Sequence, residues 1–307
     1  MSPVRALFRD AFLLSFTAYD SFCSVRTAAP APAGLFDEVL AAAERVRALL
    51  DLYDPGSELS RLNASPAGTD IPVSGELADI LSRALRFCRA SGGAFDITTG
   101  SLSRLYGFGT DRERAPRAEE LARARAGYRL FTLDENRHTA RFTQSGVVLD
   151  AGGLGKGCAA EAIARVCEGY GADDCVISLG GSLTVNLGPE RAIGVEDPSD
   201  PSAAPLVRLR LPGGMCASTS AANVRFFSEN GKIYHHILDP HTRLPADSGI
   251  VSVTVIAPDP TAADILSTAC FAGGIGALKG CLPLCPGAEA CVIFRDGTCE
   301  VPEHLLA

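Results

Sequence analysis

The chain of 307 residues has no long uninterrupted apolar run and no excess of positive charge. No stretch approaches the roughly 20 apolar residues that cross a bilayer, so no transmembrane segment is expected. The 28 lysine and arginine residues are outnumbered by 36 aspartate and glutamate residues, which gives a net charge of −8. Nucleic acid is therefore excluded as the main partner, because its phosphates need a basic face. A polyanionic ligand would need a local lysine, a helix N-terminus or a divalent cation.

Several signatures of common chemistry are also missing. The sequence contains no CxxC pair, no GxSxG motif, no HExxH motif and no EF-hand loop. These absences disfavour zinc and iron–sulfur proteins, esterases and proteases. The 11 cysteines are scattered, and most lie in apolar stretches, as is typical of small core residues in a reducing compartment. The N-terminus lacks a clear export signal, so we expect a cytoplasmic protein.

Helical and strand patterns follow one another without the regular alternation of a parallel sheet, which favours an α+β fold. Apolar residues recur at helical spacing in 34–53, after the N-cap Ser74, and in 262–272. Apolar or alternating runs predict strands at 15–27, 175–179, 191–195, 233–238, 249–256 and, as the last strand, 290–294. Because no polar linker separates these elements, we expect one large mixed α/β domain over residues 1–307.

The most informative segment is 149–157, which reads LDAGGLGKG and contains Asp150, Gly153 and Lys156. It follows a short apolar run and precedes residues 158–167, which have helical spacing, so a strand, a glycine turn and a helix are expected. This arrangement points backbone N–H groups and a helix N-terminus at an anion, and Lys156 would add a point charge for a phosphate. The alternative is a tight turn with a solvated lysine, because the spacing fits neither the Walker nor the GxGxxG pattern.

Asp264 and Thr268 lie four residues apart near the start of a predicted helix, so their side chains share one face. A carboxylate and a hydroxyl on one face suit Mg²⁺, which prefers oxygen ligands and keeps positions open for phosphate oxygens. Without further context, Asp264 could equally cap the helix and Thr268 could be a core residue.

Two further segments carry candidate residues. His235 and His236 end a predicted strand and should point to opposite faces, so one of them can enter a cleft as a proton acceptor. Phe95 and Asp96 follow a glycine pair and could form the wall of a flat-ligand pocket. The alternatives are a structural histidine in the first case and turn and core residues in the second.

In their order along the chain, these motifs resemble those of the FAD:protein FMN transferases, the ApbE family. The matching segments span residues 18–274 and read AYDSFCSV, YDPGSELSRLN, GGAFDITTGSLSRLYGFG, LDAGGLGKGCAAE, VISLGGS, KIYHHILDPHTRLP and VSVTVIAPDPTAADILSTACFAGG. The resemblance implies an α+β domain of the ApbE type with a cleft that binds FAD and Mg²⁺. It also implies that FMN passes from FAD to a Thr or Ser hydroxyl of an acceptor flavoprotein subunit, with release of AMP.

The resemblance also assigns roles to residues by motif position. FAD would be contacted by Tyr19, Tyr53, Ala94, Phe95, Asp96, Asp150, Lys156, His236 and Ile237. Mg²⁺ would be held by the Gly153 carbonyl, Asp264 and Thr268. His236 and Asp264 are the expected catalytic residues, with His236 as the base for the acceptor hydroxyl and a metal-activated hydroxyl as the rival. The assignment requires Lys156 and Asp264 to face one diphosphate.

The sequence departs from the family pattern at three places. Glu161 replaces an aspartate, Arg243 replaces the glycine of DPxTG, and 218–224, reading STSAANV, lacks the glycine that usually follows TS. Two other functions therefore stay open. One is a Mg²⁺-dependent FAD pyrophosphatase that releases FMN and AMP, and the other is a non-catalytic FAD-binding or storage protein.

Overall fold

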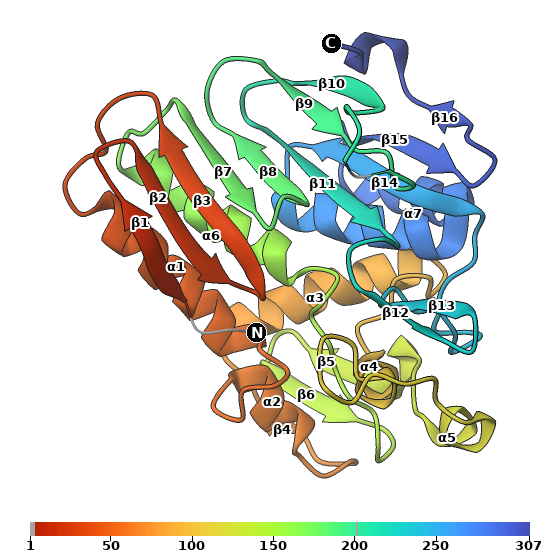
Figure 1. Cartoon of the computed structure of the whole chain (residues 1–307). Helices are drawn as coiled ribbons and strands as arrows, with labels where there is room; N and C mark the ends of the chain where they lie inside the picture. Colours follow the sequence, from red (N-terminus) through yellow and green to blue (C-terminus); the bar gives the residue numbers. More distant parts are fainter. Residues whose placement is uncertain (1–3, 201) are drawn as a thin grey trace.

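A nine-stranded antiparallel sheet forms the centre of the molecule, in the order β1-β2-β3-β7-β8-β11-β14-β15-β16 (Figure 1). The computed structural model describes residues 4–200 and 202–307. The strands of this sheet are β1 (Arg5–Arg9), β2 (Leu13–Ala18), β3 (Ser21–Thr27), β7 (Cys175–Leu179), β8 (Leu183–Asn186), β11 (Met215–Ala221), β14 (Ile250–Ala257), β15 (Glu289–Phe294) and β16 (Cys299–Glu300). With its helices, this sheet confirms the predicted α+β class.

Three small sheets and seven α-helices complete the fold of the described residues. The small sheets are β9 (Arg191–Val195) with β10 (Val207–Leu211), β12 (Phe226–Glu229) with β13 (Lys232–His235), and β4 (Ile71–Pro72), β6 (Thr139–Phe142) and β5 (Phe131–Asp134). The helices are α1 (Leu35–Leu50), α2 (Glu58–Asn63), α3 (Gly75–Ala90), α4 (Gly100–Tyr106), α5 (Ala118–Arg123), α6 (Gly155–Gly169) and α7 (Pro260–Cys281). Short 3₁₀ turns lie at Tyr128–Leu130, Leu282–Leu284 and Glu303–Leu305.

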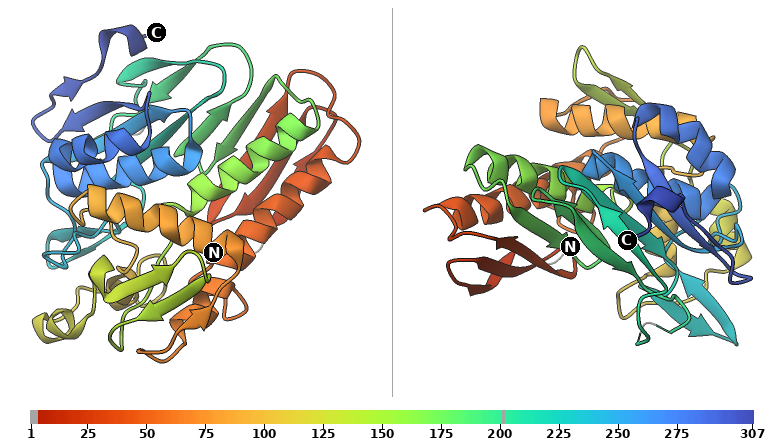
Figure 2. Two further views of the ribbon diagram at one scale, coloured as in Figure 1. Left: turned by 180° about the vertical axis from the view of Figure 1, so that it is seen from behind. Right: turned by 90° about the horizontal axis from the view of Figure 1, so that it is seen from above.

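The helices and the sheet share one main core. Helices α6 and α7 pack against strands of the sheet, while α1 contacts α6 and α3 contacts α7. These helices lie behind the sheet in Figure 1 and in front of it in the left view of Figure 2. On the other face, the β9–β10 hairpin forms a second cluster with Ala217, Ile256, Ile293 and other apolar residues. This layering brings the N-terminal ends of α6 and α7 together, because the two helices contact each other directly.

Most predicted elements are confirmed, but the strand expected at 15–27 is wrong. It is a hairpin of β2 and β3, because Tyr19 and Asp20 both adopt left-handed backbone conformations, with φ of 54° and 53°. A Tyr-Asp pair does not predict such a turn as glycine or Asn-Gly does. The strand at 233–238 is shorter than expected, and 290–294 is not the last strand, because β16 follows it.

One helical stretch of the described residues, Pro260–Leu284, is long and apolar enough by length and composition to cross a membrane. The expectation that the chain has no segment of this length is therefore wrong. Half of the stretch's apolar window is buried in the molecule, where α7 packs on β11 and β14. Asp259 caps α7 by accepting a hydrogen bond from the Ala262 N–H at 2.9 Å, and Gly274 interrupts its helical geometry.

Candidate functional site

The glycine turn is held in place by residues distant in sequence. Asn63 donates to the Leu149 carbonyl at 2.9 Å and accepts from the Leu149 N–H at 2.7 Å, and the Asp150 N–H bonds the Ile97 carbonyl at 2.7 Å. The apolar run before the turn makes isolated bridges with Thr99 and Arg125 and does not form the expected strand. Helix α6 then begins at Gly155, so the turn-to-helix part of the prediction is confirmed.

Helices α6 and α7 meet at their N-terminal ends at the closest backbone approach of this region. A Cβ on Gly157 would lie 2.6 Å from both the Pro260 carbonyl oxygen and the Thr261 Cα, so only glycine fits there without a shift. The Gly157 N–H donates to Asp264 Oδ2 at 2.9 Å. The glycine turn and the acidic helix start, 107 residues apart, are therefore one structural unit.

Asp264 is a buried carboxylate with a defined set of donors. Its Oδ1 accepts from the Ser218 hydroxyl at 3.1 Å, and only 6% of the residue is exposed. Burial raises the pKa of Asp264, whereas the positive charge of Lys156 and the two hydrogen bonds oppose that shift. Lys156 is close enough to act on this carboxylate while its Nζ donates to the Ser182 hydroxyl. Lys156 and Asp264 thus lie in the same region of the molecule, and their sharing of one diphosphate stays a prediction.

Thr268 and Gly153 complete this region, which we call the lysine–aspartate cluster (Gly153, Lys156, Asp264 and Thr268). The Thr268 hydroxyl donates to the Asp264 carbonyl at 3.0 Å. A Cβ on Gly153 would lie 3.3 Å from Thr268 Oγ1 and 3.1 Å from the Phe95 ring, so the turn passes directly over both side chains.

The donor set of the lysine–aspartate cluster fits a hard cation. Among residues 4–200 and 202–307, no group of three or more His, Cys, Asp or Glu side chains could hold a metal ion. A metal here would be held by one carboxylate and neutral oxygens, which suits Mg²⁺ because it keeps positions for phosphate oxygens. The raised pKa of Asp264 indicates that burial disfavours its charged form, and a bound cation would offset that cost.

Glu161, which replaces the aspartate of the family pattern, has hydrogen-bond partners near this cluster. Glu161 Oε2 accepts from the Thr261 hydroxyl at 2.6 Å and from Arg83 at 3.0 Å, and Arg83 also pairs with Asp259. The longer acid therefore ties α6 and α3 to the first turn of α7, directly before Asp264.

Asp150 and Tyr53 form a second part of the site. Asp150 accepts from the Gly152 N–H at 2.9 Å and from the Ser103 hydroxyl at 2.7 Å. Tyr53 is 56% exposed, and partial burial together with the nearby Asp150 charge raises its pKa. The exposed Tyr53 ring thus lies near Asp150, and its contact with FAD stays a prediction.

The two adjacent histidines point to opposite sides, as predicted. His235 bonds the Ala246 carbonyl at 3.1 Å and lies edge-on to Phe271. His236 Nδ1 lies 3.2 Å from the Arg225 carbonyl, which can only accept, so Nδ1 carries the proton and Nε2 is free to take one. Burial lowers the pKa of His236 to about 4, with smaller contributions from the charges of Arg225 and Lys156. The imidazole is therefore neutral at pH 7 and neighbours Lys156.

Four of the residues predicted to contact FAD are hydrogen-bonded or packed within the protein. They are Tyr19, Asp96, Phe95 and Ile237. The Tyr19 ring is 3% exposed, and its hydroxyl donates to the Ala43 carbonyl at 2.6 Å, so the ring belongs to the core. Asp96 accepts from the Thr98 N–H at 2.7 Å, the Thr98 hydroxyl at 2.6 Å and the Tyr128 N–H at 2.6 Å, which fixes a loop.

The other two of these contacts are apolar. Ile237 and Phe95 are buried in the core, and Ala94 beside Phe95 is half-buried. The side chains of Tyr19, Asp96 and Ile237 thus have structural roles, and any FAD contact they make stays a prediction.

The polar side chains that hydrogen-bond the motif residues were not predicted from the sequence. Ser218, Ser182, Ser103 and Asn63 each bond a motif residue from a distant segment. Ser218 lies in the STSAANV segment and Ser182 in VISLGGS, so the motifs marked the right regions without indicating which side chain would be used.

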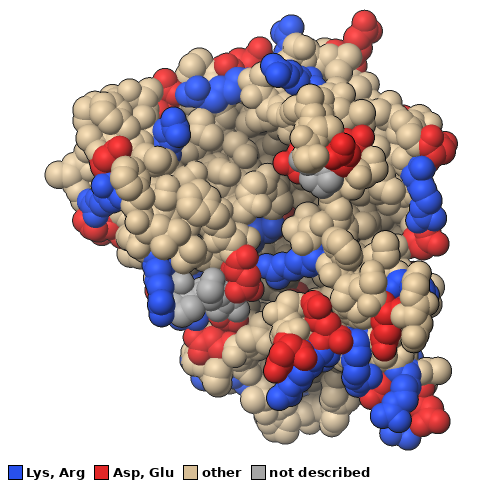
Figure 3. Space-filling model, in the orientation of Figure 1, with Lys and Arg blue, Asp and Glu red and all other residues tan. Residues whose placement is uncertain are grey.

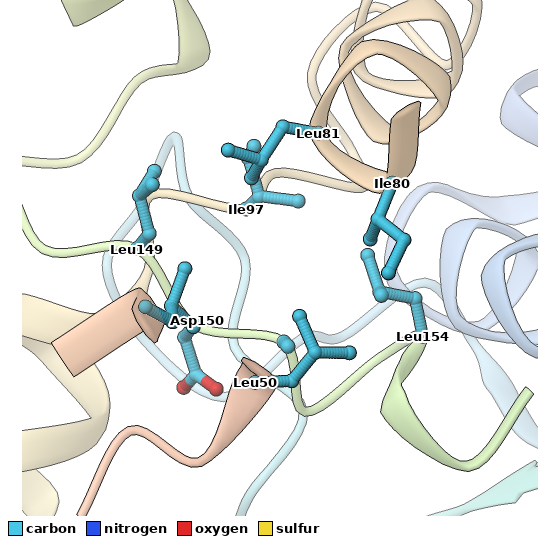
Figure 4. Close-up of a pocket in the computed structure, with 9 residues that line it drawn as sticks. Leu50, Ile80, Leu81, Ile97, Leu149, Asp150 and Leu154 are labelled. Atoms are coloured by element: carbon cyan, nitrogen blue, oxygen red, sulfur yellow. The ribbon is translucent and has the colours of Figure 1, made fainter. Parts of the chain in front are cut away.

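The surface of the molecule is hollowed on the face shown in Figure 3, and Lys or Arg side chains lie in this hollow. A separate cavity of about 10 Å³ lies beside the glycine turn, where Leu50, Leu81, Leu149 and other aliphatic side chains converge. In Figure 4 the Asp150 carboxylate points away from these side chains. This cavity holds at most about one water and is a packing gap, not a nucleotide site.

The chain matches known proteins over most of its length. The family model described as the ApbE family matches residues 17–291. The chain is 33% identical over 304 residues to the FAD:protein FMN transferase of Treponema pallidum, covering 90% of this chain and 82% of that protein. It is 31% identical over 249 residues to the FAD:protein FMN transferase of Haemophilus influenzae, covering 78% and 72%. The solved structure of the ApbE protein from Thermotoga maritima has a TM-score of 0.84 at 28% identity, covering 95% of this chain and 97% of that one.

Proposed function

Because this chain belongs to the ApbE family, we propose that it is a Mg²⁺-dependent FAD:protein FMN transferase that modifies a Thr or Ser hydroxyl of an acceptor protein and releases AMP. The observation that carries this proposal is the lysine–aspartate cluster, where Lys156 at the start of α6 lies near Asp264 and Thr268 of α7. A transferase fits this arrangement better than a storage protein, because simple binding needs no buried acid next to a phosphate-binding lysine.

The cluster supplies charge complementary to a diphosphate. Lys156 and the N-terminal end of α6 would bind phosphate oxygens. Asp264, Thr268 and the Gly153 carbonyl would hold Mg²⁺ which, when bound, would offset negative charge on the diphosphate and on the departing AMP. Such positioning and charge neutralisation supply most of the catalysis in phosphoryl transfer.

In this proposal His236 accepts the proton of the acceptor hydroxyl. The acceptor hydroxyl oxygen would form a bond to the FMN phosphorus while the bond from that phosphorus to the bridging oxygen breaks. AMP leaves with the bridging oxygen, and the hydroxyl proton passes to Nε2 of His236. The Arg225 carbonyl keeps the other nitrogen protonated, so the free lone pair is always on Nε2. A pKa of about 4 makes His236 a weak base that is fully available at neutral pH.

One experiment separates the three functions. The purified chain is incubated with FAD and Mg²⁺, with and without an unflavinylated protein subunit that naturally carries phosphoester-linked FMN. AMP and covalent flavin on the subunit are measured. Transfer predicts AMP and flavinylated subunit only when the subunit is present. AMP without the subunit would indicate FAD hydrolysis, and FAD binding without AMP would indicate storage; either result contradicts the proposal.

A further inference from the structure

Arg225 is a cation at the site to which the sequence motifs assign no role. It precedes β12, and its carbonyl accepts from both the His236 N–H at 3.1 Å and His236 Nδ1 at 3.2 Å. The guanidinium reaches in another direction, to the turn between β2 and β3. Arg225 therefore connects the proposed base with the N-terminal hairpin.

The contacts of this guanidinium are long, and the one to Asp20 is exposed. Nη2 lies 3.4 Å from the Tyr19 carbonyl and 3.7 Å from Asp20 Oδ2, with side-chain exposures of 41% for Arg225 and 48% for Asp20. An exposed ion pair at this distance stabilises a fold very little. Leaving the turn costs little as well, because water can solvate the exposed Asp20 carboxylate and the Tyr19 carbonyl gives up only a long hydrogen bond of 3.4 Å. The guanidinium is therefore free to exchange this turn for a stronger anion.

The position of the guanidinium relates it to two predicted FAD contacts. Its positive charge acts on His236, as that of Lys156 does, and also on Tyr53. Arg225 thus contacts the base through its carbonyl, and its charge reaches the exposed ring. A diphosphate brings two negative charges into a chain whose net charge is already −8, and Lys156 supplies one positive charge.

We propose that the Arg225 guanidinium leaves the Tyr19–Asp20 turn when FAD binds and donates two hydrogen bonds to the diphosphate, opposite Lys156. This inference rests on the proposed function. The planar guanidinium can bind two phosphate oxygens at once, which an ammonium group cannot. Because its backbone carbonyl holds His236, the same residue would set the distance between the phosphorus and the base.

The test compares FAD with riboflavin, which has the same ring system and no phosphate. Binding of each to the full chain with Mg²⁺ is followed by flavin fluorescence quenching. Arg225→Ala should weaken FAD binding about 10-fold or more and change riboflavin binding less than about 2-fold. Arg225→Lys should recover part of the FAD affinity. Arg210→Ala is the matched control, because Arg210 has a similarly long, exposed pair with Glu190 at 3.8 Å and lies on β10.

The outcomes distinguish this inference from the proposed function. If the wild-type chain binds both flavins, two results for Arg225→Ala would overturn the role of Arg225: an equal loss of affinity for FAD and riboflavin, or no loss of affinity for FAD. Neither result would affect the proposed function. Failure of the wild-type chain to bind FAD would contradict the proposed function and this inference with it. If Arg210→Ala lost as much FAD affinity as Arg225→Ala, the effect would be one of net charge. That result would also overturn the inference.

Discussion

The lysine–aspartate cluster and the histidine segment, residues 225–243, are built in different ways. In the cluster, Asp264 is buried, its hydrogen bonds are 2.9 and 3.1 Å long, and Gly157 lets two helices approach closely. In the histidine segment, the Arg225 guanidinium makes long contacts with the Tyr19 carbonyl at 3.4 Å and the exposed Asp20 at 3.7 Å, and Arg243 stands where the family pattern has glycine. The first region has fixed geometry, whereas the second can adapt.

This difference matches what each region has to do in the proposed reaction. A diphosphate and a metal have the same shape in every turnover, so a rigid backbone cradle serves them best. The acceptor is a protein segment, and its approach requires space and exchangeable contacts. Substitutions can test the rigidity of the cluster and the tolerance of the histidine segment separately.

Replacing Asp264 should have the largest effect on activity. Asp264→Asn keeps the shape of the side chain and removes its charge, so the metal would lose its only carboxylate. Loss of several kcal/mol of charge stabilisation corresponds to roughly 1000-fold slower AMP release. The rate is measured against Mg²⁺ concentration, and circular dichroism reports the fold. Ser199→Ala, in an exposed loop that contacts Asp197, is the control. Normal Mg²⁺-dependent turnover in Asp264→Asn would make the metal assignment wrong.

Replacing His236 should have the next largest effect. His236→Gln should slow transfer about 100-fold, at the low end of general-base contributions, because a pKa of about 4 gives a weak base. In the wild type the rate should fall as pH drops through about 4, where the imidazole becomes protonated. The variant should lack this step.

The same group affects stability with a defined sign. Its pKa is depressed from 6.5 to about 4 in the folded state, so the unfolded chain binds the proton first as pH falls. The contribution of His236 is fully present above pH 6.5 and is lost as pH falls to about 4. A denaturation series across this window should show less loss in His236→Gln than in the wild type; identical curves would contradict the assignment.

Gly157 tests the rigidity of the cluster directly. Gly157→Ala places a Cβ 2.6 Å from backbone atoms of Pro260 and Thr261 that cannot move independently of α7. Overpacking of this kind destabilises by about 1–3 kcal/mol. Gly155→Ala is the matched control on the same helix, because its Cβ would meet no atom of the described residues within 4 Å. Denaturant unfolding should separate the two variants; equal stability would mean that α6 and α7 are free to move apart.

The sequence predicted the cluster better than it predicted the details of the cleft. Glycine, lysine and acid motifs fall in a recognisable order, and their convergence follows from the family fold. The burial of Tyr19 was not predictable, because a turn of two left-handed residues that are neither glycine nor asparagine has no local signal. The role of Asp96 was missed for another reason: its partner, the Tyr128 N–H, is 32 residues away on the backbone. Only tertiary structure reveals such pairs.

Arg243 gives the smallest and most discriminating prediction, because two effects oppose each other. Its φ of 64° is a left-handed conformation that favours glycine, yet its guanidinium donates to the Leu121 and Ala122 carbonyls at 2.8 and 3.2 Å. Arg243→Gly relieves strain and loses these hydrogen bonds, so its stability should change by less than about 1 kcal/mol. Arg243→Ala loses the hydrogen bonds and keeps the strain, so it should be less stable than Arg243→Gly by about 1 kcal/mol. Thermal unfolding of both variants decides this. If glycine were the less stable of the two, the backbone strain at Arg243 would be absent, and the tolerance ascribed to the histidine segment would have to come from somewhere else.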